Sequence, residues 1–171
     1  MTILDIRLIP DPVLRKKAEA VERPSDEITT LLDDMAETMY NAPGIGLAAN
    51  QVGILKRLIV IDCSTDEEEP NLLKMINPEI ITSTNEKSEL EEGCLSIPEH
   101  KSNVVRPSKV ELSYMNQNGE IERLIAEGIL SACVQHEVDH LNGILFIDHI
   151  SRLKRDMIIR KVKKQLRENE K

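Results

Sequence analysis

The chain has 171 residues and is 40% hydrophobic, which suits a single domain over residues 1–171 with a packed core. Its net charge of −8 argues against generic DNA binding, and no apolar run approaches the roughly 20 residues that a membrane helix needs. The N-terminal stretch MTILDIRLIPDP lacks the basic start and apolar core of a signal peptide, so we expect a cytoplasmic protein without membrane or DNA partners.

Two helices are predicted in the first quarter of the chain. Asp11 directly before Pro12 has the arrangement of an N-cap followed by proline at the first helical position, which predicts a short helix over residues 11–18. In Ser25–Tyr40, apolar residues recur every three or four positions and two acidic residues occupy the first turn. This pattern predicts an amphipathic helix that ends before Pro43.

The next segment, Gly44–Gly53, reads GIGLAANQVG and fits the G-x-G-x-x-G/A pattern of dinucleotide-binding loops. Such a loop binds pyrophosphate only between an incoming strand and an outgoing helix. Here a helix precedes the glycines, and only about eight residues separate Ala49 from the next apolar run, too few for a crossover helix. A nucleotide-binding protein is therefore an alternative of a different class. Nucleotide-dependent stabilisation without a bound transition metal would identify it.

Short runs rich in β-branched and apolar residues follow. They lie at residues 58–62, 72–76, 80–84, 109–115 and 121–126. Turn signals separate them, notably Asn77-Pro78 and Asn116–Gly119. Because such short links suit antiparallel neighbours, the sequence predicts antiparallel sheets.

Two more helices are predicted near the C-terminus. Glu127–Asn142 is apolar around much of its circumference and should be buried, with Gly143 placed to end it. A last helix, over residues 151–168, is basic: from Ser151 onward nine Lys/Arg and three Asp/Glu give +6, which leaves −14 on the rest of the chain. The expected fold is α+β, with small antiparallel sheets around one buried helix and a C-terminal helix.

The buried helix carries an H-E-x-x-H motif, His136 to His140. Residues four apart share a helix face, so the two imidazoles can bind one metal ion. Glu137 is rotated by about 100° from His136 and can accept a proton from water at the metal. The alternative is a pair of ordinary core histidines. That alternative would bury two histidines, a glutamate and an aspartate in an apolar helix without a compensating role, which would cost several kcal/mol.

The third ligand decides the type of metal protein. A metzincin would have histidine where Phe146 stands, and a thermolysin-like enzyme would use a later glutamate, which only the basic tail offers. A thiolate suits a site with two imidazoles. Cys133 precedes His140 by about 10.5 Å of helical rise, which strains a shared site. Cys63 and Cys94 remain, and spacing does not choose between them.

Three segments together resemble the motifs of the peptide deformylase family, in the family's order and spacing. They are GIGLAANQVG at Gly44–Gly53, EGCLSIPE at Glu92–Glu99 and QHEVDHLNG at Gln135–Gly143. The likeness to the bacterial form of the family extends along nearly the whole chain. It implies one Fe²⁺ per chain, held by Cys94, His136 and His140, with Zn²⁺, Ni²⁺ or Co²⁺ as substitutes. Ligand chemistry alone would favour zinc, so iron is an inference from the family.

The resemblance also implies an activity and catalytic roles. Peptide deformylases remove the formyl group from the N-terminal formylmethionine of newly synthesised polypeptides and release formate; another H-E-x-x-H hydrolase acting on peptide amides is the alternative. Glu137 would be the base, and the segment around Gly46 would form one wall of the site. The negative charge that develops on the formyl oxygen would be held by the Gln51 side chain and the backbone N–H of Leu95.

An apolar methionine pocket is expected on the same helix. Ile129, Ala132 and Cys133 precede His136 by seven, four and three residues and so share its helix face. With Ile45 and Leu90 they are the predicted pocket residues. Ala132 is smaller than the aliphatic residue often found at this position in the family, which predicts a roomier pocket.

Other polar residues are assigned supporting or surface roles. Glu92, Arg106 and Asp139 are expected around the ligands, with Arg106 either paired with Asp139 or solvated at the surface. His100 and His149 are expected to be ordinary surface or loop histidines.

The basic C-terminal helix has two interpretations. In related deformylases a C-terminal helix docks on the ribosome near the exit of the nascent chain, and a +6 segment on a −14 body would be attracted to ribosomal RNA. The alternative is a solvated amphipathic helix that covers the core.

A structural metal protein is a further alternative class, but it would need a fourth protein ligand, which the sequence does not offer at a convincing spacing.

Overall fold

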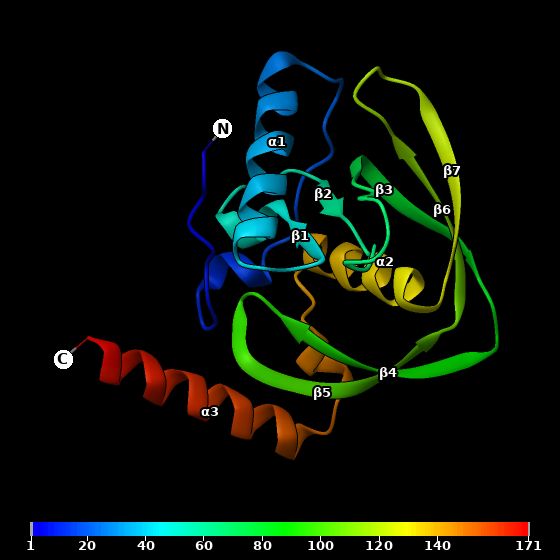
Figure 1. The fold of residues 1–171 in the computed structure, drawn as a ribbon. Coiled ribbons are helices and arrows are strands. Elements are labelled where there is room, and N and C mark those ends of the chain that lie inside the picture. The colour runs from blue at the N-terminus through cyan, green and yellow to red at the C-terminus, as the bar shows by residue number, and fades with distance from the viewer. Residues whose placement is uncertain (1, 171) are drawn as a thin grey trace.

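The structure, a computed structural model, describes residues 2–170. It has the predicted α+β architecture, in which two antiparallel sheets surround one buried helix (Figure 1). The elements in chain order are η1 (Pro12–Arg15), α1 (Asp26–Asn41), β1 (Gly46–Ala48), η2 (Ala49–Val52), β2 (Leu58–Ile61), β3 (Leu73–Ser83), β4 (Lys87–Cys94), β5 (Ile97–Pro107), β6 (Lys109–Met115), β7 (Ile121–Glu127), α2 (Gly128–Leu141), η3 (Phe146–His149) and α3 (Arg152–Asn169).

Helix α2 is the centre of the fold. The larger sheet has the strand order β1-β2-β3-β6-β7 and packs on one side of α2, while the β4–β5 hairpin lies on the other (Figure 1). Val134 and Leu141 of α2 are fully buried among apolar residues of the larger sheet, including Ile59 and Met75. Contact on several sides explains why the apolar residues of this helix are not confined to one stripe.

Helix α1 covers the start of the larger sheet. The Ser25 side chain caps it by accepting a hydrogen bond from the Ile28 backbone N–H at 3.2 Å. Its apolar face, which includes Leu32 and Met35, packs on β1 and β2. Burying one such side chain stabilises the fold by about 1.5–3 kcal/mol. This packing fixes the glycine segment, because β1 belongs to it.

The β4–β5 hairpin was not predicted from the sequence. The two strands pair in antiparallel register from Lys87 opposite Pro107 to Cys94 opposite Ile97. They lack a strong alternation of apolar and polar residues, because the two-stranded sheet buries few side chains, among them Val104. The hairpin nevertheless delivers Cys94 to the site.

Two predicted boundaries were wrong. Asn77-Pro78 does not end a strand: β3 runs through it with a bulge, because Asn77 adopts a positive φ of 53° and its side-chain amide bonds the backbone of Val21 at 2.8 and 2.7 Å. The helix predicted over residues 11–18 is only the 3₁₀ turn η1. After this turn the chain becomes extended, since the Ala18 backbone N–H bonds the Leu141 carbonyl at 2.8 Å.

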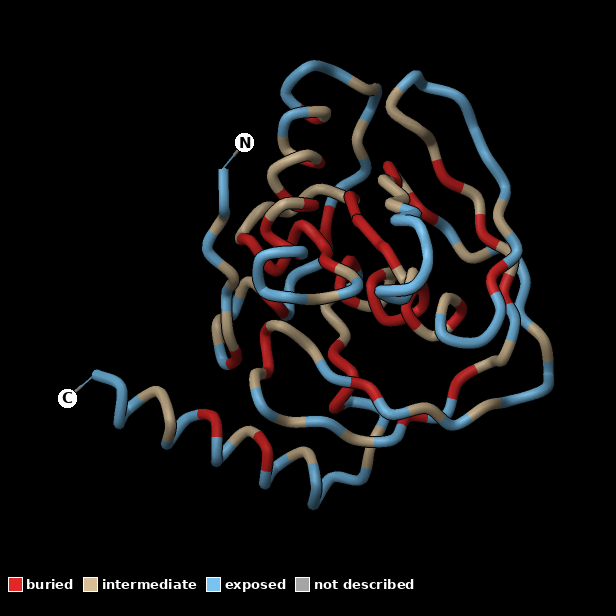
Figure 2. The backbone as a smooth tube through the Cα atoms, viewed as in Figure 1, coloured by how far each residue is buried: buried red, intermediate tan, exposed pale blue. Residues whose placement is uncertain are grey.

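Helix α3 projects from the body of the molecule and is largely exposed (Figures 1 and 2). The buried Ile158 and Val162 attach it to an apolar cluster that contains Phe146. Among residues 2–170, no helix combines the length and apolarity required to cross a membrane.

Candidate metal centre

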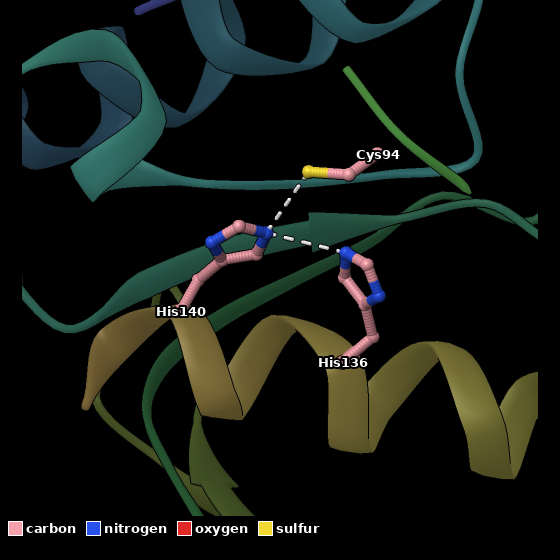
Figure 3. Close-up of side chains that lie close together, drawn as sticks. All are labelled: Cys94, His136 and His140. Carbon is pink, nitrogen blue, oxygen red and sulfur yellow. Dashed lines mark hydrogen bonds between the residues drawn. The ribbon is translucent and has the colours of Figure 1, made fainter. Parts of the chain in front are cut away.

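The side chains of Cys94, His136 and His140 converge on one point (Figure 3). Cys94 Sγ lies 3.3 Å from His140 Nε2, which lies 3.2 Å from His136 Nε2. One ligand atom from each residue falls within 4.8 Å of the others. His140 is fully buried and His136 is 9% exposed. The structure thus brings together the three residues that the family resemblance assigned to the metal.

The opposite edge of the His136 ring is held by a buried ion-pair network. Its Nδ1 lies 3.0 Å from Glu92 Oε1. Arg106 donates to both carboxylate oxygens of Glu92, at 2.6 and 3.0 Å, and to Asp139 Oδ2 at 2.9 Å. Because His136 Nδ1 is paired with Glu92, His136 Nε2 is the ring nitrogen that can bind a metal ion. Arg106 is 5% exposed, so it belongs to the site and not to the surface.

The charges in this network favour an ionised Glu92. Burial alone would raise its pKa, but the hydrogen bonds from His136 and Arg106 outweigh burial and lower the pKa to about 2. His149, expected to be an ordinary surface or loop histidine, also contacts the network, with Nε2 at 2.8 Å from Asp139 Oδ2. Nothing in the local sequence signals that contact, since His149 lies in η3, beyond the end of α2.

Gln51 reaches the centre from the glycine segment. Its Oε1 accepts a hydrogen bond from the Ala48 backbone N–H at 3.0 Å, which orients the side-chain NH₂ away from that strand. The NH₂ donates to Ser96 Oγ at 3.1 Å and to Cys94 Sγ at 3.4 Å. Ser96, which the sequence analysis did not single out, is fully buried and fixes this amide. Leu95 lies between Cys94 and Ser96, in the turn that joins β4 to β5.

Glu137 lies beside the ligands and is 2% exposed. Its Oε1 is 4.0 Å from His140 Nε2. Burial raises the pKa of Glu137 to about 7. A carboxyl group with this pKa can accept and return a proton near neutral pH.

The donor set fits a divalent transition metal. Among the described residues, the buried side-chain atoms without a hydrogen-bond partner include Glu137 Oε1. Two imidazole nitrogens and a thiol point at one another, an arrangement that a shared cation would satisfy. Within residues 2–170 three protein ligands converge and no fourth joins them, which leaves one position of a tetrahedral site for a small molecule, as in catalytic and not structural sites.

The predicted pocket residues differ in their exposure. Ile45 and Ile129 are 49% and 60% exposed, while Leu90 and Ala132 are partly buried and Cys133 is 8% exposed. Cys63, the other candidate ligand, lies outside the three-ligand group and packs against the apolar cluster that contains Cys133.

The chain is similar to known proteins over almost its full length. Residues 3–156 match the family model described as polypeptide deformylase. The peptide deformylase of Agrobacterium fabrum is 50% identical over 167 residues, which cover 98% of both chains. That of Azotobacter vinelandii is 51% identical over 169 residues, which cover 99% of both chains.

Solved structures give the same result. The crystal structure of peptide deformylase from Ehrlichia chaffeensis matches with a TM-score of 0.94 and 40% identity, over 98% of this chain and 99% of the other. A second structure from that organism, in complex with actinonin, matches with a TM-score of 0.92 and 41% identity, over 96% and 98%. The likeness covers the β4–β5 hairpin and α2, which supply the converging residues.

Proposed function

The chain belongs to the polypeptide deformylase family and removes the formyl group from the N-terminal formylmethionine of newly synthesised proteins, releasing formate; we propose that Cys94, His136 and His140 hold Fe²⁺ for this reaction. The observation that carries the proposal is the convergence of one thiol and two imidazoles beside a buried glutamate. This ligand set also suits Zn²⁺, so the ligands alone do not choose the metal. The choice of iron is an inference from the family.

A bound divalent cation supplies Lewis acidity, which activates water and polarises the formyl carbonyl. Glu137 then acts as the general base: its carboxylate takes the proton from the attacking water and later delivers it to the leaving amine. Its burial suits both steps, because a pKa of about 7 allows either protonation state.

Two groups of the chain are positioned to hold the negative charge that develops on the formyl oxygen. The Gln51 side-chain NH₂ already points toward Cys94, at 3.4 Å from Sγ, and the backbone N–H of Leu95 follows that ligand directly. Loss of one such donor typically costs about 2.7–4 kcal/mol of transition-state stabilisation. The buried contact of Gln51 with Ser96 supports this role, since it fixes the amide before substrate arrives.

The methionine side chain would lie against Ile45, Leu90, Ile129, Ala132 and Cys133. Three of these residues share the helix face of His136, and Ile45 approaches from the glycine segment. The apolar side chains would exclude water around the substrate, while the ligands and Glu137 act at the formyl group.

Metal analysis combined with formate release tests this function. Protein purified without oxygen should contain about one iron per chain and release formate from a formyl-Met peptide. Cys94→Ala should lose the metal, and the matched control Cys63→Ala should retain it. Metal retention by Cys94→Ala together with metal loss by Cys63→Ala would contradict the ligand assignment. Actinonin, which the related Ehrlichia chaffeensis protein binds, is a suitable probe of the assembled site.

We further propose that residues 1–171 form one catalytic domain. We also propose that α3 binds the ribosome in the cytoplasm. Apart from its buried attachment residues, α3 is mostly exposed and basic, and it projects away from the acidic body (Figure 1). Because the converging residues and Glu137 precede α3, truncation after its first turn should preserve deformylation of peptides but weaken ribosome association. If five phosphates are contacted, the log-log salt slope should be roughly −3.5 to −4.5. Undiminished, salt-insensitive binding by a folded truncated protein would contradict the proposal.

A further inference from the structure

The ring of His149 contacts the ion-pair network of the metal centre from outside helix α2. His149 is the last residue of η3, and its Nε2 lies 2.8 Å from Asp139 Oδ2. Because an ionised carboxylate only accepts hydrogen bonds, Nε2 carries the proton and donates to Asp139. The same oxygen of Asp139 accepts from Arg106 Nη1 at 2.9 Å. His149 and Arg106 therefore hold one carboxylate oxygen between them.

From Asp139 the hydrogen bonds continue to a proposed metal ligand. Arg106 donates to the two carboxylate oxygens of Glu92 at 2.6 and 3.0 Å, and Glu92 Oε1 lies 3.0 Å from His136 Nδ1. The side chains of His149 and Asp139 are 35% and 21% exposed, whereas the rest of the path is buried. His149 is thus the solvent-side end of a chain of hydrogen bonds that reaches the His136 ring.

The packing of η3 fixes the position of His149. Phe146, the first residue of η3, is buried, and its ring stacks against the His136 ring with the centroids 6.2 Å apart and an angle of 22° between the planes. Arg15 binds the carboxylate of Asp148, directly before His149, at 2.6 and 3.2 Å. The turn that carries His149 therefore touches the same ligand ring that the hydrogen-bond path reaches, so two separate contacts connect η3 to His136.

We propose that His149 is a positioning residue, which holds the His136 ring in its metal-binding orientation through the path of Asp139, Arg106 and Glu92. The proposal rests on the proposed function, in which His136 is a metal ligand. The His149 N–H keeps the Asp139 carboxylate turned toward Arg106, and Arg106 in turn keeps Glu92 against His136 Nδ1. Without this N–H, water replaces His149 at a carboxylate that is already partly exposed, and Asp139 is free to turn away from Arg106.

Two substitutions at His149 separate the hydrogen bond from the space that the ring fills. His149→Leu removes the donor, whereas His149→Gln keeps an N–H donor at about the reach of the imidazole Nε2. The measured quantity is the Kd for Zn²⁺, obtained by competition with a chelator. Groups that orient a metal-binding histidine typically contribute about 10- to 100-fold to metal affinity, and His149 is the most distant member of the path. We therefore expect the Kd to rise about tenfold in His149→Leu and to stay within about twofold of wild type in His149→Gln.

A double substitution tests the path itself. If His149 acts through Asp139, its removal should matter only while the carboxylate is present. In an Asp139→Ala background, His149→Leu should therefore change the Kd for Zn²⁺ by less than about twofold, because the effects of residues in one hydrogen-bond network are not additive. A further tenfold rise in the double variant would contradict the path through Asp139. His100→Leu is the matched control: His100 is a partly exposed histidine of β5 outside the Arg106 network, and its removal should leave the Kd unchanged.

The result does not depend on turnover. Urea unfolding of each variant shows whether it is folded, and His149→Ala, which also lacks the donor, takes the place of His149→Leu if that variant is not. A wild-type Kd for Zn²⁺ in the folded variant without a donor refutes the proposal, and so does an equal loss of affinity in His149→Gln. Failure of wild-type protein to release formate from a formyl-Met peptide would instead contradict the proposed function and leave the zinc measurements as they are.

Discussion

Gly46 lies so close to Glu137 that a larger side chain does not fit at position 46: a Cβ added to Gly46 would lie 2.5 Å from Glu137 Oε2. Real Cβ atoms essentially never approach a neighbour this closely, and the neighbour here is a fully packed side chain that is 2% exposed. The glycine, which also fits a nucleotide-binding pattern, therefore leaves room for the close approach of the Glu137 carboxylate.

Gly46→Ala should displace Glu137 and lower kcat/KM by roughly 100-fold, since a shift of about 1 Å at a catalytic group has this effect. Metal content should stay unchanged, because the atoms nearest to the added Cβ belong to Glu137 and Cys133 and not to the proposed ligands. The added Cβ would also lie 3.0 Å from Cys133 Sγ. The double variant with Cys133→Ala relieves only that second contact, so its kcat/KM should remain low. Recovery in the double variant would show that Cys133, and not Glu137, is the sensitive neighbour.

Glu137→Gln should retain the metal but lose nearly all turnover. The substitution keeps the size of the side chain and removes the proton acceptor, and general-base catalysis contributes about 10²–10⁴ in rate. Metal content by elemental analysis and formate release by assay check the two halves of this prediction. Near-normal formate release from a metal-loaded Glu137→Gln protein would exclude Glu137 as the base.

Much of this site could be predicted because its residues cluster along the sequence. His136, Glu137 and His140 share one helix, so helical spacing alone places the two imidazoles together. Cys94 could not be chosen over Cys63 by spacing, because the β4–β5 hairpin that delivers it has too weak an apolar pattern to be recognised. Family resemblance supplied that choice.

Other features depend on contacts between distant segments, which no local pattern encodes. The continuation of β3 through Asn77 depends on hydrogen bonds between the Asn77 side chain and the backbone of Val21. The early end of η1 depends on the hydrogen bond from the Ala18 backbone N–H to the Leu141 carbonyl. The contact of His149 with the Arg106 network is of the same kind. The helices α1, α2 and α3 and the strands β2, β6 and β7 were predicted well, whereas the short turn η1, the bulge in β3, the β4–β5 hairpin and the long-range contacts were not.

Arg106→Met should destabilise the folded protein by about 3–5 kcal/mol, because it leaves the buried carboxylate of Glu92 without its cation. Denaturant unfolding of the zinc-loaded protein measures this change. Arg123→Met is the matched control: its ion pair with Glu111 is exposed, so the change should stay within about 1 kcal/mol. Equal effects of the two substitutions would mean that burial of the Arg106 network contributes nothing.

Stability at acid pH should depend on Asp148. Burial would raise the pKa of this carboxyl, but the hydrogen bonds from Arg15, at 2.6 and 3.2 Å, outweigh burial and lower the pKa below its ordinary value of 3.8. A pKa that is lower in the folded state stabilises the protein above the unfolded-state value, and this contribution is lost as the pH falls through the folded-state value. Asp148→Asn should therefore reduce the free energy of unfolding at pH 7 and make it less dependent on pH below about 4. If the free energy of unfolding, measured by urea titration, depends on pH below about 4 in the same way in Asp148→Asn and in the wild type, the prediction is contradicted.

Ala132→Ile should narrow the substrate pocket. Ala132 is partly buried on the helix face that carries His136, next to Ile129, which is 60% exposed. A larger side chain there should exclude bulky first residues more than methionine, and each methylene in an apolar pocket changes discrimination by about 10-fold or more. The ratio of kcat/KM for a formyl-Met peptide to that for a formyl-Phe peptide should rise by roughly this factor. Ala20→Ile, at an exposed position outside the predicted pocket, should leave the ratio unchanged. The same ratio in Ala132→Ile and wild type would show that Ala132 does not contact the substrate side chain.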